Sequence, residues 1–274
     1  MEQEIQDIII RALHEDIGRG DVTVSATIPA DARGSFKFVA REKMVVCGSE
    51  IASHVFGQLS PEIHFHGLIK DGAMVNPGTV IATVEGPTAS ILTGERVALN
   101  LWQRMSGIAT ITHSYVEAVQ GTKAIIRDTR KTMPGLRVLD KYAVRMGGGQ
   151  NHRMRLDDAV LIKDNHIAAC GSVTAAIQKA RSQNLPVMVE CDTLQQVEEA
   201  LKAGVDSILL DNMSPEMVRQ AVAVVKGRVK LEASGGVTLK NVRAIAETGV
   251  TYVSVGRLTQ SAPAADVGLD FVSV

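Results

Sequence analysis

Beyond residue 123 the chain alternates short apolar runs with helical stretches, and this alternation restricts its fold more than any other feature. The runs are nearly continuous in apolar residues, which predicts strands buried on both faces of a parallel sheet and covered by helices. They are KAIIRDT, AVLIKDN, PVMVECDT, SILLDNM, VKLEASGG and YVSVGRL. Such units either close into a barrel or form an open doubly wound sheet. We favour the barrel, because no GxGxxG motif follows the first run and charged residues end nearly every run.

The first part of the chain has a different pattern. Between residues 22 and 90, short β-type runs are separated by turn signals at Asp71-Gly72 and Asn76-Pro77-Gly78. This predicts a small, mostly antiparallel sheet. The following segment GERVALNLWQRMSG has apolar residues at helical spacing. Arg96, Asn100 and Arg104 share one polar face of that helix, and the residues alone favour contact with solvent for this face.

Length and composition exclude several classes of protein. A chain of 274 residues can hold one large domain or two modest ones, and 45% hydrophobic and 22% charged residues are typical of a globular protein. Neither a secretory signal nor an apolar run long enough to span a membrane is present. The three cysteines, Cys47, Cys170 and Cys191, lack CxxC spacing, which argues against disulfides and zinc and favours the cytoplasm. A net charge of −1 gives no reason to expect nucleic acid or an anionic membrane as a partner.

Charge is nevertheless concentrated in one part of the chain. Residues 127–163 contain nine Lys or Arg and four Asp, a net charge of +5, so the remainder carries −6. Within the motifs DTRKTMPGLR and NHRMRLDDAVLIKDNH, we expect four of these cations and one histidine to meet near one rim of the barrel: Arg130, Lys131, His152, Arg153 and Lys163. Gathering like charges at one rim costs repulsion unless an anion fills the gap, and both Arg and Lys bind carboxylate or phosphate. The segment therefore predicts an anion site.

Different residue types follow the later strands of the predicted barrel. The last two strands end in glycine turns, at Ser234-Gly235-Gly236 and at Gly256, where exposed backbone N–H groups suit a phosphate. Plain turns remain the alternative for these glycines. Glu190 and Asp211 end two middle strands and could bind Mg²⁺ together with substrate phosphates. Ion pairs with the nearby cations are the alternative for these two carboxylates.

Taken together, these motifs resemble the quinolinate phosphoribosyltransferase family. The resemblance covers nearly the whole chain and is carried by HEDIGRGDVT, ALNLWQRMSGIAT, DTRKTMPGLR, NHRMRLDDAVLIKDNH, LLDNM, EASGGVTLKNV and SVGRLTQSAP. It implies an α/β fold with a small N-terminal α/β sandwich domain and an incomplete α/β (TIM-like) barrel. We expect the sandwich domain at residues 1–107, joined by the tail 262–274, and the barrel at 108–261.

The resemblance also implies an activity and a role for each site residue. The family is a group of glycosyltransferases that join quinolinate to phosphoribosyl pyrophosphate with Mg²⁺, giving nicotinate mononucleotide, pyrophosphate and CO₂ for NAD biosynthesis. It implies a cytoplasmic homodimer or larger homo-oligomer, with Arg104 reaching into the site of the partner subunit. The implied roles are quinolinate binding by Arg130, His152, Arg153 and Lys163, binding of phosphoribosyl pyrophosphate and Mg²⁺ by Lys131, Glu190 and Asp211, and 5′-phosphate binding by Ser234, Gly235, Gly236 and Gly256.

Three positions depart from the family pattern. Arg257 and Gln260 stand where alanine and histidine are usual, and Met133 replaces a common threonine. Arg257 could add a phosphate contact or mark the related protein encoded beside molybdate transporters, whose substrate is uncertain. Two readings from other classes are a non-catalytic sensor of phosphate ligands and an aldolase that uses Lys163 as a Schiff base.

Overall fold

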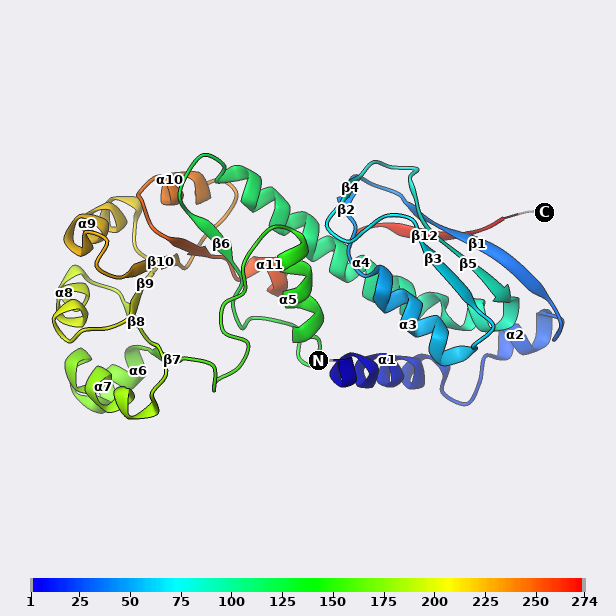
Figure 1. Ribbon diagram of the computed structural model, residues 1–274, viewed down its shortest axis with the longest axis horizontal. Helices are drawn as coiled ribbons and strands as arrows, with labels where there is room; N and C mark the ends of the chain where they lie inside the picture. The colour runs from blue at the N-terminus through cyan, green and yellow to red at the C-terminus, as the bar shows by residue number, and fades with distance from the viewer. Residues whose placement is uncertain (1, 273–274) are drawn as a thin grey trace. The chain divides into compact units, whose positions relative to one another are not determined.

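The computed structural model describes residues 2–272, and its chain divides into two compact units. Unit 1 contains the chain up to His113, the segment Thr132–Gly148 and the chain from Thr259 onward. Unit 2 contains Ser114–Lys131 and Gly149–Leu258. The sequence analysis expected one domain at 1–107 with the tail 262–274 and another at 108–261, whereas unit 1 also includes the inner segment Thr132–Gly148. Figure 1 labels the elements of both units.

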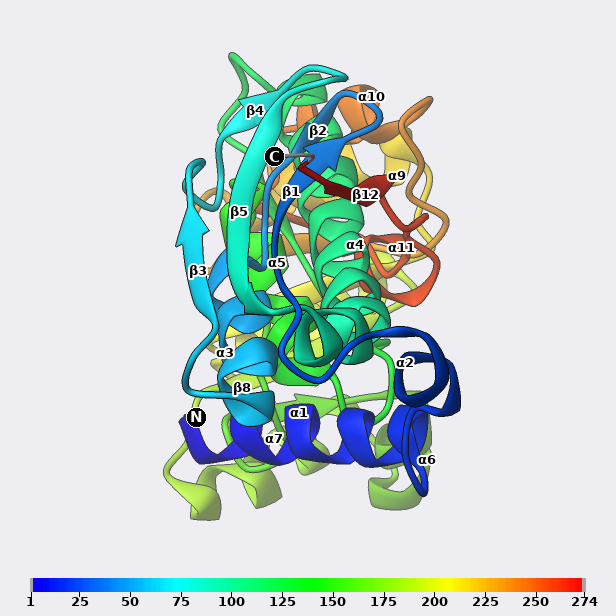
Figure 2. The ribbon, with the colours of Figure 1, turned by 90° about the vertical axis from the view of Figure 1, so that its right-hand side faces the viewer.

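Unit 1 is built on an antiparallel sheet in the order β12-β1-β5-β3. Its strands are β1 (Arg33–Ala40), β3 (His64–Gly67), β5 (Val80–Pro87) and β12 (Val267–Phe271), and β2 (Met44–Val45) pairs separately with β4 (Met74–Val75). Figure 2 shows β1, β3, β5 and β12 side by side. The predicted antiparallel sheet is confirmed, and Gly72 and Gly78 occupy turns with φ of 92° and 85°.

Helices supply the other layer of unit 1. They are α1 (Glu2–Ile17), α2 (Val22–Thr27), α3 (Ser49–Leu59), α4 (Thr88–Ala118), which continues into unit 2, and α5 (Arg137–Met146). The predicted helix at 94–107 is confirmed as part of α4, which is 31 residues long. The sequence prediction of β runs throughout 22–90 was wrong at α2 and α3. In α3 the buried residues Ile51, Ala52, Val55 and Phe56 recur at helical spacing and form one buried face.

An aromatic cluster fills the space between the sheet and the helices of unit 1. The rings of Phe38 and Trp102 lie 5.0 Å apart between centroids, and both side chains are fully buried. Phe56 and Phe65 stack on each other, and both rings are tilted against that of Phe38. This cluster joins β1, α3, β3 and α4, which fixes the position of the helix that carries Arg104.

Unit 2 contains a parallel sheet in the order β6-β11-β10-β9-β8-β7. All six predicted strands are confirmed: β6 (Ile125–Arg127), β7 (Val160–Ile162), β8 (Val187–Cys191), β9 (Ser207–Asp211), β10 (Lys230–Ser234) and β11 (Tyr252–Ser254). Within residues 2–272 no ladder joins β6 to β7, so the ring is incomplete. The α/β fold with an incomplete barrel is therefore confirmed.

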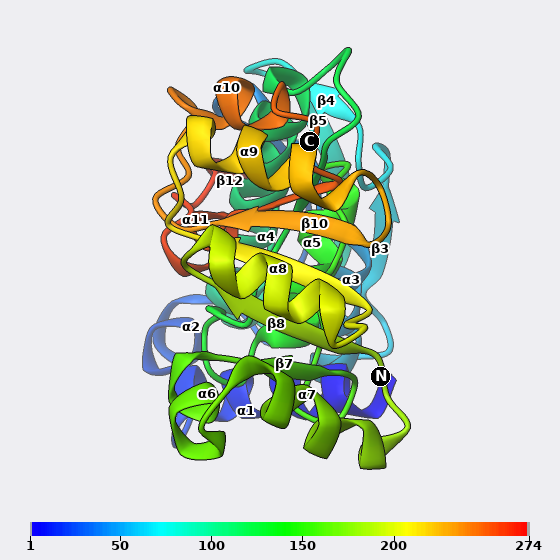
Figure 3. The same cartoon turned by 90° about the vertical axis from the view of Figure 1, so that its left-hand side faces the viewer.

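Helices follow the strands of unit 2 and cover the outer face of its sheet, as Figure 3 shows for α6 to α9. They are α6 (Asp164–Cys170), α7 (Val173–Ala180) with a short 3-10 turn (Arg181–Gln183), α8 (Leu194–Lys202), α9 (Pro215–Val225), α10 (Val242–Ala246) and α11 (Arg257–Gln260), which ends in unit 1. Side-chain caps at Ser172, Thr193 and Ser214 accept backbone N–H groups at the starts of α7, α8 and α9. None of the helices in the described chain is long and apolar enough to cross a membrane.

Candidate active site

All predicted site residues except Arg104 belong to unit 2. Several of them stand at the carboxyl ends of its parallel strands. Asp211 ends β9 and pairs in register with Ser234, which ends β10, while Glu190 lies on the neighbouring β8. Lys163 directly follows β7, and its Nζ donates a hydrogen bond of 2.6 Å to Oε2 of Glu190. The ion pair that the sequence analysis kept as the alternative for Glu190 is therefore present.

A buried carboxylate that sequence reasoning did not place in the site lies inside the barrel. The side chain of Glu232 is only 1% exposed, and its Oε2 accepts a hydrogen bond of 3.0 Å from Nη1 of Arg127. Its Oε1 accepts from Oγ of Ser254 and lies 3.5 Å from Nε2 of His152. The guanidinium of Arg127 stacks on the Tyr252 ring at 3.6 Å. Glu232 thus links three strands and the predicted quinolinate ligand His152.

A second buried carboxylate, Asp128, fixes the backbone that carries His152 and Arg153. It follows β6 and accepts hydrogen bonds from Nδ2 of Asn151 at 2.6 Å and from the backbone N–H of His152 at 2.8 Å. Nδ1 of His152 then accepts the backbone N–H of Arg153 at 2.7 Å. The sequence contained one signal for this role, since Asp128 stands at a strand end beside the cations.

Arg153 lies within electrostatic range of Arg130. Burial lowers the pKa of its guanidinium, and the positive charge of Arg130 lowers that pKa further. Nη1 of Arg153 donates to the carbonyl of Ala159 at 2.8 Å, which holds the side chain in place. Arg130 and Lys131 are exposed. Repulsion between Arg130 and Arg153 favours a bound anion at this rim.

The glycine turn after β10 leaves no room for a side chain at Gly235. Gly235 and Gly236 have φ of 90° and 61°, and a Cβ atom on Gly235 would stand 2.2 Å from Oδ1 of Asn212. Asn212 itself has φ of 53°, and its backbone N–H donates to the carbonyl of Ser234 at 2.9 Å. Gly256 lies in the turn between β11 and α11, directly before the exposed Arg257. Two adjacent turns with little Cβ bulk thus end neighbouring strands.

Two carboxylates at the rim could take part in binding a metal ion. Glu190 and Asp211 are half-buried, and Oδ2 of Asp211 accepts from Nδ2 of Asn212 at 2.7 Å. Among residues 2–272 no group of three or more His, Cys, Asp or Glu could hold a metal ion. Mg²⁺ commonly takes one or two carboxylates and completes its shell with water and substrate phosphates. The two carboxylates fit Mg²⁺ that arrives with a phosphorylated substrate.

Arg104 lies in unit 1, where it is held by an aspartate that sequence reasoning missed. Its Nε donates to Oδ1 of Asp140 at 2.8 Å, and its Nη2 donates to Oδ2 at 2.7 Å. The side chain of Asp140 is fully buried and that of Arg104 is 21% exposed. The expectation from the residues alone that this helix face only contacts solvent is wrong for Arg104, because the partner on α5 is distant in sequence.

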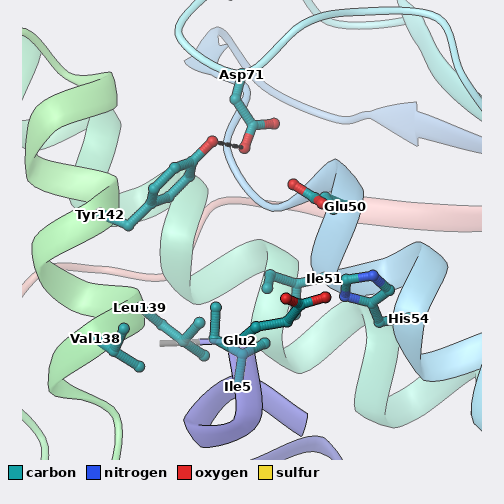
Figure 4. Close-up of a pocket in the computed structure, with 9 residues that line it drawn as sticks. All are labelled: Glu2, Ile5, Glu50, Ile51, His54, Asp71, Val138, Leu139 and Tyr142. Carbon is teal, nitrogen blue, oxygen red and sulfur yellow. Dashed lines mark hydrogen bonds between the residues drawn. The ribbon is translucent and has the colours of Figure 1, made fainter.

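Unit 1 also contains a cavity of about 530 Å³ that is separate from the predicted site residues. Figure 4 shows its lining, in which the hydroxyl of Tyr142 donates to Oδ2 of Asp71 at 3.0 Å. Burial raises the pKa of Tyr142, and the charge of Asp71 raises it further. The remaining lining residues are Glu2, Ile5, Glu50, Ile51, His54, Val138 and Leu139. None of them belongs to the catalytic or binding residues expected from the sequence.

The family of the chain follows from two matched domains. Residues 21–106 match the quinolinate phosphoribosyl transferase N-terminal domain, and residues 108–270 match the C-terminal domain of that transferase. The chain belongs to the quinolinate phosphoribosyltransferase family. The family suggested by the sequence motifs is thereby confirmed.

Individual members of the family are similar over almost their whole length. The chain is 46% identical over 275 residues to the carboxylating nicotinate-nucleotide pyrophosphorylase of Mycobacterium leprae, covering 97% of this chain and 96% of that one. The crystal structure of nicotinate-nucleotide pyrophosphorylase from Ehrlichia chaffeensis matches with a TM-score of 0.94 and 46% identity, over 97% and 98% of the two chains. The corresponding structure from Francisella tularensis gives a TM-score of 0.96 at 38% identity, over 99% and 97%.

Proposed function

We propose that this member of the family is a carboxylating nicotinate-nucleotide pyrophosphorylase. It transfers the phosphoribosyl group of phosphoribosyl pyrophosphate to quinolinate, giving nicotinate mononucleotide, pyrophosphate and CO₂ in NAD biosynthesis. The observation that carries this proposal is the rim of unit 2, where Lys163 forms an ion pair with Glu190 in the same parallel sheet whose strand β10 ends in the glycine turn at Gly235. The near-complete similarity to the Mycobacterium leprae enzyme supports the same substrates.

The proposed roles follow the chemistry of each side chain. Arg130, His152, Arg153 and Lys163 bind the two carboxylates of quinolinate. Lys131, Glu190 and Asp211 bind phosphoribosyl pyrophosphate and its Mg²⁺, and Ser234, Gly235, Gly236 and Gly256 bind the 5′-phosphate. Mg²⁺ would neutralise charge on the pyrophosphate that leaves. In support, the Lys163–Glu190 ion pair puts a group from the quinolinate set beside one from the phosphoribosyl pyrophosphate set.

The reaction needs positioning and charge stabilisation rather than a covalent nucleophile. The bond between the ribosyl carbon and pyrophosphate breaks with build-up of positive charge on the ribose, and the nitrogen of quinolinate then forms the new bond to that carbon. The ring nitrogen becomes positive as a result. The carboxylate on the adjacent carbon leaves as CO₂, its bonding electrons stay on the ring as a carbanion stabilised by that charge, and a proton replaces the carboxylate.

Lys163 has a setting that favours anion binding over Schiff-base chemistry. A nucleophilic lysine needs a neutral amine, which proteins obtain in an apolar pocket or beside other cations. Here Nζ of Lys163 forms an ion pair with Glu190, and the lysine side chain is 46% exposed. These contacts favour a charged ammonium group that binds a carboxylate of quinolinate. Borohydride in the presence of a carbonyl substrate should therefore trap no covalent adduct.

The proposed working form is a cytoplasmic homodimer, or a larger homo-oligomer, in which Arg104 serves the site of the partner subunit. Two observations support this role for Arg104: Asp140 holds its guanidinium in one orientation, and part of the Arg104 side chain stays exposed. Neither a nucleic acid nor a membrane is part of the proposal. In this proposal, two copies of the chain are needed to complete each site.

Substrate choice tests the proposed function. Each charge-assisted hydrogen bond contributes about 1.5–3 kcal/mol, so a ligand with one carboxylate fewer should lose on the order of 10²-fold in kcat/KM. Pure protein with Mg²⁺ and phosphoribosyl pyrophosphate should convert quinolinate well and nicotinate poorly. Equal rates with both acids would contradict the proposal and favour a relative with a different substrate.

A further inference from the structure

The carboxylate of Asp140 binds both the predicted site residue Arg104 and the loop that contains Met133. It lies on α5 with a side chain exposure of 0%, and it binds both Nε and Nη2 of Arg104. Oδ2 also accepts the backbone N–H of Met133 at 3.1 Å. We propose that Asp140 is a positioning residue that orients Arg104 for its work in the partner subunit's site. This inference rests on the proposed function.

The geometry of the pair restricts the guanidinium. Two parallel N–H···O bonds between Arg104 and Asp140 define the plane of the fork as well as its distance. Nη2 has a further contact of 3.3 Å to the carbonyl of Thr259, which begins the last segment of unit 1. Nη1 has no hydrogen-bond partner among residues 2–272. Asp140 thus fixes one edge of the guanidinium and leaves a donor for an anionic ligand.

A purely structural role explains the pair less well. Buried ion pairs contribute little to stability compared with apolar side chains of similar volume, so stability alone gives no reason for this one. The carboxylate is fully buried, whereas Arg104 keeps 21% of its side chain exposed. The guanidinium of Arg104 is thus held by a buried carboxylate and is still accessible to a ligand, as a preorganised binding group must be.

The contact with Met133 defines the competing explanation. Met133 follows Arg130 and Lys131 in the motif DTRKTMPGLR. The carbonyl of Met133 accepts the N–H of Leu136, and Nε of Arg137 donates to Oγ1 of Thr132, so this loop is ordered by several bonds. Asp140 could therefore act on the cations of its own subunit. The two explanations differ in which subunit's site is affected.

Mixed dimers distinguish these explanations. Asp140→Asn keeps the shape of the side chain but gives an N–H₂ group that cannot accept from Arg104. We expect kcat/KM to fall by about 10²-fold, the order of loss that a misplaced binding group causes. Dimers reassembled from Asp140→Asn and Lys163→Ala chains should recover about a quarter of wild-type activity, because random pairing makes half the dimers mixed and half their sites complete. Dimers of Asp140→Asn with Arg104→Ala chains should recover none.

The opposite result overturns the proposal. If Asp140 acts on its own subunit's cations, its mixture with Lys163→Ala leaves every site defective and recovers nothing. Recovery by the Arg104→Ala and Lys163→Ala mixture in the same experiment shows that subunit exchange works. No recovery in that mixture, with mixed dimers verified by two affinity tags, would remove the shared site itself and with it the proposed role of Asp140. If the wild-type protein did not convert quinolinate at all, the proposed function would be wrong, and this outcome is distinct from a failure of the role proposed for Asp140.

A double variant keeps the inference testable if Asp140→Asn folds poorly. Arg104→Ala with Asp140→Asn removes both charges, so no buried charge is left without a partner. Its kcat/KM should equal that of Arg104→Ala alone, whereas a further loss of about 10-fold or more would contradict action through Arg104. Glu247→Gln, which breaks the exposed pair with Arg243, is the matched control and should leave kcat/KM unchanged.

Discussion

Nζ of Lys163 lies 2.6 Å from Oε2 of Glu190, although 27 residues separate them in the sequence. Lys163 follows β7 and Glu190 lies on β8, and these strands are neighbours in the parallel sheet of unit 2. In our account these two residues serve different substrates, so the ion pair must open when quinolinate binds. Their contact makes the two halves of the site interdependent.

Glu190→Gln tests this interdependence. The substitution removes the carboxylate that competes with quinolinate for Lys163. In the absence of phosphoribosyl pyrophosphate, the variant should therefore bind quinolinate more tightly than the wild type does. Turnover should fall by about 10²-fold, because a preorganised charge near phosphoribosyl pyrophosphate is lost. Calorimetry with quinolinate and steady-state kinetics measure the two effects. A parallel fall in quinolinate affinity and turnover would show that Glu190 belongs to the quinolinate half of the site.

Asp211→Asn tests the assignment of the metal. It keeps the shape of the side chain and removes one charge, so half-maximal activity should need about 10-fold more Mg²⁺. The affinity for quinolinate alone should not change. Asp192→Asn, at an exposed carboxylate beside the same rim, is the control and should leave the Mg²⁺ requirement unaltered. An unchanged Mg²⁺ titration for Asp211→Asn would contradict the assignment.

Gly235→Ala tests the phosphate turn. At φ of 90° an added Cβ would meet Oδ1 of Asn212 at 2.2 Å, so the turn must move. We expect the KM for phosphoribosyl pyrophosphate to rise by about 10-fold or more, since such displacements weaken binding groups. Gly227→Ala, with φ of 72° and open space around it, carries the backbone strain without the clash and should leave this KM unchanged. Equal effects of both variants would indicate general strain rather than a phosphate site.

Glu232→Gln tests whether the buried carboxylate holds the barrel together. It would leave Arg127, whose side chain is 19% exposed, without its counter-charge. Removing one partner of a buried pair typically costs about 3–5 kcal/mol, so denaturant unfolding should show a loss of that order. The exposed pair of Glu216 and Arg219 gives the control, because Glu216→Gln should cost less than about 1 kcal/mol. Equal losses would contradict the role assigned to Glu232.

The sequence predicted the parts of the fold that depend on local patterns. Each strand of unit 2 lies in a nearly continuous apolar run, and the turns at Gly72 and Gly78 need the backbone freedom of glycine. The helix α3 was missed, because it is short and lies between β-type runs. The prediction of an incomplete ring rested on the family resemblance. The missing pairing between β6 and β7 leaves no pattern in the sequence of either strand.

The site was predictable only where residues stand at strand ends. Lys163, Glu190 and Asp211 could be found because parallel strands end at one rim. The carboxylates of Asp140 and Glu232 could not, because their partners lie 36 and 105 residues away and burial is visible only after folding. A single acidic residue in a helix or strand gives no sign that it will hold an arginine.

The fate of the carboxylate next to the ring nitrogen tests the account most directly. Quinolinate labelled in that carboxylate should be incubated with the protein, Mg²⁺ and phosphoribosyl pyrophosphate, and labelled CO₂ and pyrophosphate should be counted together. Our account predicts one labelled CO₂ for every pyrophosphate, with unlabelled nicotinate mononucleotide as the other product. Pyrophosphate release with the label retained in the product, or no release of either with quinolinate, would contradict it.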